Sequence, residues 1–170
     1  CWRPLTQGDW DLSEVMLTAW TNFAKYGDPN GPDGGEWKPY TKDNGKFRVL
    51  KSRNIGNNEI VNIPDYDCYI DSIEGLDVAK YLNQANCVLL PNLTYNPRAC
   101  FLPKGCIADG SVAILTLAKD DDIVTNEDLA FYATDSFTKF YAIARNLGTR
   151  SLNIDNNSVF FFGKLKQQRI

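Results

Sequence analysis

The sequence predicts an α+β fold: a small mixed or antiparallel sheet with helices packed on it, and one detached N-terminal helix before it. Three observations predict this. Apolar residues recur at helical spacing over residues 12–26. A loop rich in Gly, Pro and Asp at 28–36 then separates that helix from the remainder. From Phe47 onward, short apolar runs alternate with turn residues, which is typical of short strands, so we expect two parts, residues 1–46 and 47–170.

The predicted N-terminal helix has both a start signal and a stop signal. Asp11 and Glu14 are spaced as a capping box, in which each residue's side chain bonds the other's backbone N–H. Gly27 supplies the left-handed residue at which helices commonly end. Between these signals the apolar stripe consists of Leu12, Val15, Met16, Ala19, Trp20 and Phe23.

The second part is predicted to contain several short strands. The segment 111–117, SVAILTL, has the strongest strand pattern, and the run 87–90 ends at Pro91, which cannot continue a central strand. We interpret 92–103 as irregular, because Pro97 and Pro103 mark bends there. The predicted strands are 47–50, 59–63, 87–90, 111–117 and 158–162, with a short helix over 76–82.

A helical region is predicted after the last inner strand. Thr125 or Asn126 caps its start, Asp135 caps a second helix, and Gly148 ends that helix. Its apolar positions recur at steps of three and four residues and are Leu129, Ala133, Phe137, Phe140, Tyr141, Ala144 and Leu147.

Composition excludes several classes of function. The 170 residues carry 18 Lys+Arg against 21 Asp+Glu, so the chain lacks the strong positive charge common in nucleic-acid binders, although a local basic face stays possible. The sequence has no histidine, so Ser-His-Asp and Cys-His catalysis cannot be completed within it. No nucleotide-binding glycine motif and no G-x-S-x-G elbow occurs, and we predict no catalytic residue in this chain.

The cysteines indicate neither a metal site nor a disulfide framework. The five cysteines show no C-x-x-C spacing, and without histidine a zinc site is not predicted. Their simplest interpretation is reduced, mostly buried thiols in a cytoplasmic protein. No apolar run reaches the roughly 20 residues that span a bilayer, and no signal-peptide pattern opens the chain, so we expect a cytoplasmic location and no membrane partner.

Polar residues gather in the segments that follow predicted strands and helices. Arg and Asn side chains match the edges of guanine and adenine, and Lys and Ser suit phosphate oxygens. The alternative is ordinary turn chemistry, because Asn and Gly tolerate left-handed backbone. The candidate residues are Lys51, Arg53, Asn54, Arg98, Lys104, Arg145, Arg150, Ser151 and Asn153.

The first part resembles the C-terminal tail of type-B carboxylesterases. The motifs that carry the resemblance are Cys-Trp-Arg-Pro-Leu-Thr at 1–6, Trp-Thr-Asn-Phe-Ala-Lys-Tyr-Gly-Asp-Pro-Asn-Gly at 20–31, and Glu-Trp-Lys-Pro-Tyr-Thr at 36–41. The resemblance implies a segment that follows the catalytic histidine and packs on the outside of an α/β-hydrolase. The serine elbow, the acid and the histidine are absent here, so no catalytic residue is carried over.

The remainder, about 45–166, is similar to the target-recognition region of restriction–modification N6-adenine DNA methyltransferases and of type I specificity subunits. The similar motifs are 49–55 with 59–60, the strands 87–90 and 110–115, the helix 128–137, and 148–155. The resemblance implies a sequence-specific DNA-binding module with two partners, double-stranded DNA and a methyltransferase catalytic domain. S-adenosylmethionine would be bound by that absent domain, and no cofactor by this chain.

The sequence thus leads to one hypothesis and two alternatives. In the DNA-recognition hypothesis Lys51, Lys104 and Arg145 contact phosphates. Bases are then contacted by Arg53, Asn54, Arg150 and Asn153. The hypothesis requires that the turn after the first strand and the turn after the long helix meet in one cationic surface. The alternatives are a non-catalytic fragment of a type-B carboxylesterase-like hydrolase, and a protein–protein interaction module using strand edges.

Overall fold

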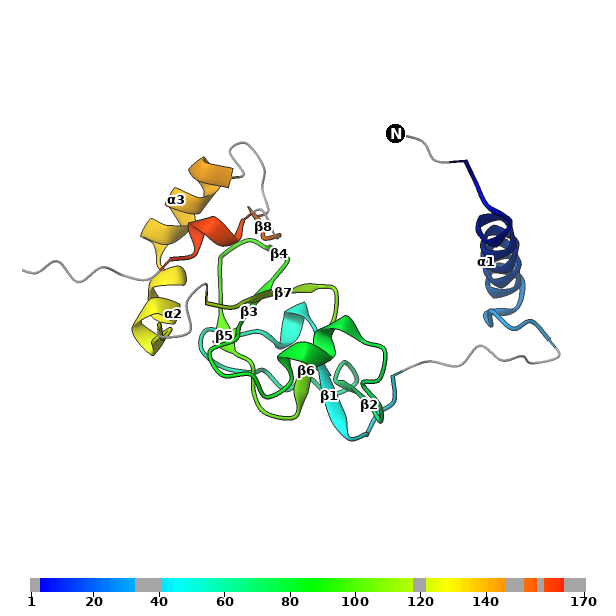
Figure 1. The fold of residues 1–170 in the computed structure, drawn as a ribbon, viewed down its shortest axis with the longest axis horizontal. Helices are drawn as coiled ribbons and strands as arrows, with labels where there is room; N and C mark the ends of the chain where they lie inside the picture. The colour runs from blue at the N-terminus through cyan, green and yellow to red at the C-terminus, as the bar shows by residue number, and fades with distance from the viewer. Residues whose placement is uncertain (1–3, 33–40, 118–121, 146–151, 156–157, 164–170) are drawn as a thin grey trace, which may run out of the picture. The chain divides into compact units, whose positions relative to one another are not determined.

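A computed structural model describes residues 4–32, 41–117, 122–145, 152–155 and 158–163 (Figure 1). The chain divides into two compact units, Cys1–Tyr40 and Thr41–Ile170. Among the described residues, the first contains one helix and the second contains short strands followed by two helices, so the predicted α+β class with a separate N-terminal helix is confirmed.

The helix of the first unit, α1, runs from Gln7 to Tyr26 and begins earlier than predicted. The carboxylate of Asp9 accepts hydrogen bonds from the backbone N–H and the hydroxyl of Thr6, both at 2.7 Å, and these bonds fix the start of the helix. The predicted cap at Asp11 is therefore wrong, because that residue lies inside the helix. The predicted stop at Gly27 is confirmed: its φ is 71°, and its N–H donates to the carbonyl of Phe23 at 2.8 Å.

Three small sheets form the strand part of the second unit. In the first sheet β1 (Phe47–Leu50) lies between β2 (Cys68–Ile70), to which it is antiparallel, and β6 (Cys106–Ala108), to which it is parallel. In the second sheet β3 (Val88–Pro91) lies between β5 (Cys100–Phe101) and β7 (Val112–Leu115), both antiparallel to it. The third sheet pairs β4 (Leu93–Thr94) with β8 (Leu152–Asn153).

The two helices of the second unit follow one another closely. α2 spans Asn126–Tyr132 and α3 spans Asp135–Arg145. The predicted cap at Thr125 is confirmed, since its hydroxyl and N–H bond the carboxylate of Asp128. The cap of α3 is Thr134 rather than the predicted Asp135, because the Thr134 hydroxyl accepts from the N–H of Phe137 at 3.2 Å.

β3 connects the two largest apolar clusters of the second unit, and this explains its continuous apolar run. Val88 and Leu90 pack with Leu129, Phe137 and other residues beneath α2 and α3. Leu89, between them in sequence, packs on the other face with residues of β1 and β7. A strand that is buried on both faces carries no polar alternation.

Two predicted strands are wrong. The segment 59–63 contributes only an isolated bridge between Ile60 and Ile55, because a tight turn with Asn58 at φ 56° brings the two residues face to face. The segment 158–162 contains a 3₁₀ turn, η3 (Val159–Phe161), instead of a strand. Phe161 and Phe162 pack edge-on or tilted against Tyr141, so aromatic packing replaces sheet pairing there.

The described part of the second unit also holds two 3₁₀ turns, η1 (Ser52–Asn54) and η2 (Asp77–Tyr81), and η2 lies where a short helix is predicted. The segment 92–103, predicted to be irregular, holds the two-residue strands β4 and β5. Within the described ranges, every helix is too short or too polar to cross a lipid bilayer.

Candidate functional site

The first candidate site is the surface of α1. Within the first unit no residue of this helix is buried, although it carries many large apolar side chains. Trp20 is 68% exposed and Phe23 is 61% exposed, whereas large aromatic side chains are ordinarily buried. The other exposed large apolar residues of the helix are Trp10, Leu12, Val15, Met16, Leu17 and Tyr26.

These side chains are unevenly distributed around the α1 axis. Leu12, Met16 and Phe23 are separated by one and two helical turns and lie on one face, which we call the apolar face of α1. Leu17 lies roughly 140° away from Leu12 around the axis, at 3.6 residues per turn. α1 therefore has an apolar side that a second protein surface could cover.

The loop after α1 folds back onto the helix and explains the glycine-rich motif at 27–31. The side-chain amide of Asn22 donates to the carbonyl of Pro29 at 3.2 Å. The N–H of Asn30 donates to the Asp28 carboxylate at 2.8 Å, and the N–H of Gly31 donates to the Asp28 carbonyl. Gly31 has φ 81°, and a Cβ there would lie 3.2 Å from the Asn22 amide nitrogen. These residues build a rigid helix end rather than a chemical site.

Gly31→Ala should loosen the end of α1, because it forces an L side chain into left-handed backbone against Asn22, a cost of about 1–2 kcal/mol. Amide hydrogen exchange of the full chain measures this as faster exchange in the last turn of α1. Gly8→Ala is the matched control, since a Cβ at Gly8, in the first turn, would meet only the Thr6 hydroxyl at an ordinary 3.8 Å, and alanine is the better helix former. Equal exchange in both variants would contradict the role given to Gly31.

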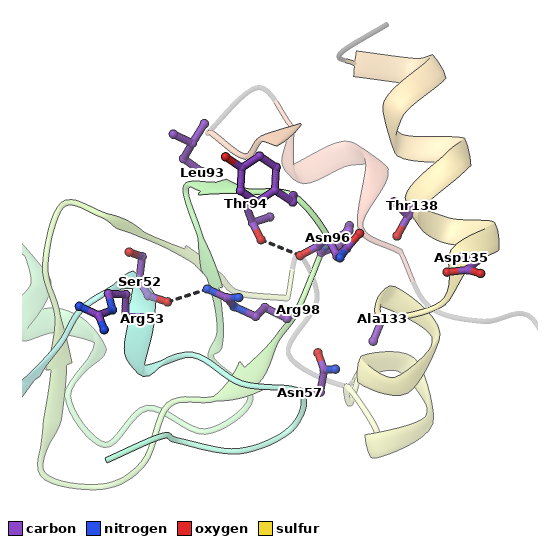
Figure 2. A pocket seen from close by; sticks show the side chains of 12 residues that line it. Ser52, Arg53, Asn57, Leu93, Thr94, Asn96, Arg98, Ala133, Asp135 and Thr138 are labelled. Atoms are coloured by element: carbon purple, nitrogen blue, oxygen red, sulfur yellow. Dashed lines mark hydrogen bonds between the residues drawn. The ribbon is translucent and has the colours of Figure 1, made fainter. Parts of the chain in front are cut away.

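The second candidate site is a pocket of about 620 Å³ within the second unit (Figure 2). Its walls come from the η1 turn, from the segment around β4, and from the junction of α2 and α3. Figure 2 shows Arg98 extending toward Ser52, with Asp135 and Thr138 on α3 across the pocket. The lining residues are Ser52, Arg53, Asn57, Leu93, Thr94, Tyr95, Asn96, Pro97, Arg98, Ala133, Asp135 and Thr138.

Asn54 holds the η1 wall of the pocket in place. Its side chain is fully buried, and its carbonyl accepts from the Lys51 N–H at 3.0 Å. Its amide donates to the Val61 carbonyl at 3.0 Å and to the Asp67 carboxylate at 2.6 Å. Ser52 is tied to the strand side by its N–H, which donates to the hydroxyl of Ser111 at 3.0 Å. The wall is therefore a preformed element.

Arg98 is the most distinctive group in this pocket. It is half-buried, and one terminal nitrogen donates to the Ser52 carbonyl at 3.3 Å. Its Nε is buried and has no hydrogen-bond partner, and no described carboxylate pairs with the guanidinium. The positive charge is thus partly removed from water without an anion beside it, which is unfavourable.

The structure brings only some of the predicted DNA-contacting residues together. Lys51 and Arg53 both stack on the ring of Tyr66, at 3.8 and 4.7 Å from its centroid. Arg53 also lines the pocket with Arg98, whereas Lys104 is exposed on a turn and does not line it. Lys51, Arg53 and Arg98 are therefore the predicted contact residues that the fold brings near one another.

The other members have structural roles or lie elsewhere. Asn54 is buried and cannot reach a base. Arg145 pairs with Asp155 at 2.9 Å and donates to the Ser158 hydroxyl. Asn153 lies in β8, where its carbonyl accepts the hydroxyl of Tyr141 at 2.7 Å. Arg150 and Ser151, with the turn after the long helix, lie outside the described residues.

Among the described residues the cysteines form no metal site, and the two most buried thiols are unreactive. Cys68, Cys87, Cys100 and Cys106 are free, and in the described part of the chain no three His, Cys, Asp or Glu residues cluster as metal ligands do. Burial raises the pKa of Cys100 to about 12, and it also raises the pKa of Cys87. Both thiols therefore stay protonated at neutral pH and are poor nucleophiles.

Comparison with known proteins relates the N-terminal part of the chain to one family. The carboxylesterase family matches residues 3–64, which include all of α1 and extend through β1 and η1. Bile salt-activated lipase of Rattus norvegicus is 48% identical over 48 residues, which are 26% of this chain and 8% of the lipase. Bile salt-activated lipase of Homo sapiens is 45% identical over 48 residues, or 26% of this chain and 6% of that protein.

Acetylcholinesterase of Gallus gallus is also similar, with 41% identity over 49 residues, or 28% of this chain and 6% of the cholinesterase. The chain thus spans less than a tenth of the length of these curated relatives. The predicted resemblance of the first part to a carboxylesterase tail is supported by these matches.

The prediction that the chain is a DNA-recognition module of a restriction–modification methyltransferase is wrong. The matched family and relatives are carboxylesterases, lipases and a cholinesterase, and nothing supports a methyltransferase recognition domain. Two of the predicted DNA-contacting residues also have other roles in the fold, since Asn54 is buried and the charge of Arg145 is neutralised by Asp155. The partners predicted with that function, double-stranded DNA and a catalytic domain, and the cytoplasmic location remain predictions.

Proposed function

We propose that residues 4–32 act as a docking segment of a carboxylesterase-type hydrolase, and that the apolar face of α1 packs on the α/β body of that hydrolase. The chain itself contributes no catalytic histidine, since the sequence contains none. The match of residues 3–64 to the carboxylesterase family supports this proposal, and so does the rigid helix end built by Asn22, Asp28 and Gly31.

The exposure of the apolar face of α1 is the observation that carries the proposal. A 20-residue helix that buries none of its residues gains little from packing, and short helices are marginal in water on their own. Burying one leucine-sized side chain contributes about 1.5–3 kcal/mol. Covering Leu12, Met16 and Phe23 together would therefore stabilise α1 strongly, and a hydrolase body would supply the surface.

A graft into a known relative tests the proposal. Residues 3–64 of this chain replace the corresponding stretch of rat bile salt-activated lipase, and the graft is compared with a lipase from which that stretch is deleted. We expect the graft to unfold at a higher temperature than the deletion and to hydrolyse an aryl ester. A graft no more stable and no more active than the deletion would overturn the proposal.

Two leucines of α1 provide a matched pair within that graft. Leu12→Ser removes a side chain from the apolar face and should cost about 2–3 kcal/mol of stability. Leu17→Ser makes the same change on a different side of the helix and should have little effect, because Leu17 would stay in water. Equal losses of melting temperature in the two variants would show that the apolar face is not what docks.

A further inference from the structure

Three partly buried arginines of the second unit differ in whether a carboxylate neutralises their charge. Arg48 and Arg145 are both partly buried, with 17% and 32% of their side-chain surface exposed, and each has an aspartate partner. Arg48 bonds Asp67 at 2.7 Å, and Arg145 bonds Asp155 at 2.9 Å. Arg98, also half-buried, has only the neutral carbonyl of Ser52 among the described residues.

The position of Arg98 distinguishes it further from the other two. Arg48 also leaves its Nε without a partner, but its charge is neutralised by Asp67. Arg98 instead lines a pocket, and Arg53 lines the same pocket from the η1 turn. The guanidinium of Arg53 lies on the ring of Tyr66, 4.7 Å from its centroid, which restricts its movement. Two cationic groups thus stand on one side of a cavity that contains no bonded anion.

The opposite wall has a different character. Asp135 and Thr138 stand on α3, and the amides of Asn57 and Asn96 lie between the walls (Figure 2). A ligand that suits this lining carries an oxyanion at one end and hydroxyl or amino groups at the other. A volume of about 620 Å³ is the size of a small-molecule site.

We propose that this pocket binds a small polar metabolite through its carboxylate or phosphate group, which pairs with Arg98, while hydroxyl or amino groups of the ligand face Asp135 and Thr138. A guanidinium binds either oxyanion in a two-pronged, charge-assisted manner. The ligand supplies the negative charge that Asp67 and Asp155 supply to the other two arginines. The site lies entirely in the second unit, so it does not depend on the function proposed for α1.

Calorimetric titration of the full chain tests the site and distinguishes the two oxyanions. Malate is the carboxylate probe, ribose 5-phosphate is the phosphate probe, and ribose is the uncharged control. We expect saturable binding of at least one anion with a Kd below about 1 mM, and none of ribose. Failure of both anions to bind saturably would overturn the proposal.

Variants identify the residues responsible. Arg98→Gln should weaken binding of the anion about tenfold or more, and Arg98→Lys should weaken it less, because it keeps the charge but not the fork. Lys104→Gln, which removes a cation outside the pocket, should leave the affinity unchanged. Equal losses for Arg98→Gln and Lys104→Gln would indicate non-specific charge attraction and would overturn the proposal.

A blocking variant keeps the test decisive should Arg98→Gln fail to fold. Ala133→Phe fills the pocket from the end of α2 and leaves Arg98 intact. The near-ultraviolet circular dichroism of the tyrosines verifies that the variant is folded. A folded Ala133→Phe protein should lose anion binding, and undiminished binding would place the anion elsewhere and overturn the assignment.

Discussion

Phe137→Ala should lower the free energy of unfolding of the second unit by about 3–5 kcal/mol. Phe137 is 2% exposed and lies at the centre of an aromatic cluster in which α2, α3 and η3 meet. Its ring is 5.2 Å from those of Tyr132 and Phe162 and 6.1 Å from that of Tyr141. Truncation leaves a cavity among packed rings that cannot close around it. The protein therefore loses the transfer free energy of the buried ring and also bears the cost of the cavity.

The measurement must follow the second unit specifically. All four tryptophans, at positions 2, 10, 20 and 37, lie in the first unit, so tryptophan fluorescence does not monitor the aromatic cluster. Denaturant-dependent amide hydrogen exchange in α2 and α3 does. Phe140→Ala is the matched control, because Phe140 is 49% exposed on the same helix, and it should cost about 1 kcal/mol. Comparable losses in the two variants would show that the cluster is loosely packed.

Asp67→Asn should destabilise the second unit by about 2–3 kcal/mol, because Asp67 is the acceptor on which several donors converge. Its carboxylate accepts from Arg48 at 2.7 Å, from the Asn54 amide at 2.6 Å and from the N–H of Ile63 at 3.2 Å. Asparagine offers one carbonyl oxygen and one N–H₂ group, so one donor would face another donor. The change also leaves Arg48 without its counter-charge.

The pH dependence of this effect has a defined sign. Burial by itself raises the pKa of Asp67, but the hydrogen bonds from Asn54, Arg48 and Ile63, with the charge of Arg48, outweigh it and hold the pKa below the ordinary 3.8. The unfolded chain therefore takes up the proton first as the pH falls. The stability that Asp67 contributes is present above about pH 4 and is lost as the pH falls below 3.8 through the folded-state pKa. The difference in free energy of unfolding between wild type and Asp67→Asn, measured by denaturant unfolding at a series of pH values, should therefore shrink as the pH falls below 3.8.

Asp71→Asn is the control for Asp67. The Asp71 carboxylate pairs with Lys42, but both side chains are more than half exposed, and water and salt screen such pairs. The substitution should leave the unfolding midpoint nearly unchanged. A loss at Asp71 as large as that at Asp67 would contradict the special role assigned to the Arg48–Asp67–Asn54 network.

Local features of the fold could be predicted from the sequence because their partners lie a few residues apart. Thr125 and Asp128 are three positions apart, and Gly27 bonds back only to Phe23, so the start of α2 and the end of α1 follow from local pattern. Thr6 with Asp9 and Asp11 with Glu14 both have the spacing of a capping box, and the sequence does not show which pair forms the cap. The predicted start of α1 is therefore too late.

The pocket could be predicted only in part. Arg53 and Arg98 were singled out by residue type, but Asn57, Thr94, Asp135 and Thr138 were not recognised as their neighbours. These pocket residues come from three stretches, 53–57, 94–98 and 135–138, which are separated by dozens of positions, and no motif connects these stretches. Asn54 was predicted to face a ligand, yet it is buried, because the alternation of polar and apolar residues says little inside a 3₁₀ turn.

The sequence by itself determined the start of α2, the end of α1, the buried run of β3, the amphipathic character of α1 and the absence of a histidine-dependent active site, all of which depend on composition or on neighbours within four positions. Only the tertiary structure decided which arginine has a counter-charge. Arg48 meets Asp67 across 19 positions and Arg145 meets Asp155 across 10, whereas the fold brings no described carboxylate to Arg98. Pairing of charges depends on which strands and turns become neighbours, and that is a property of the folded chain.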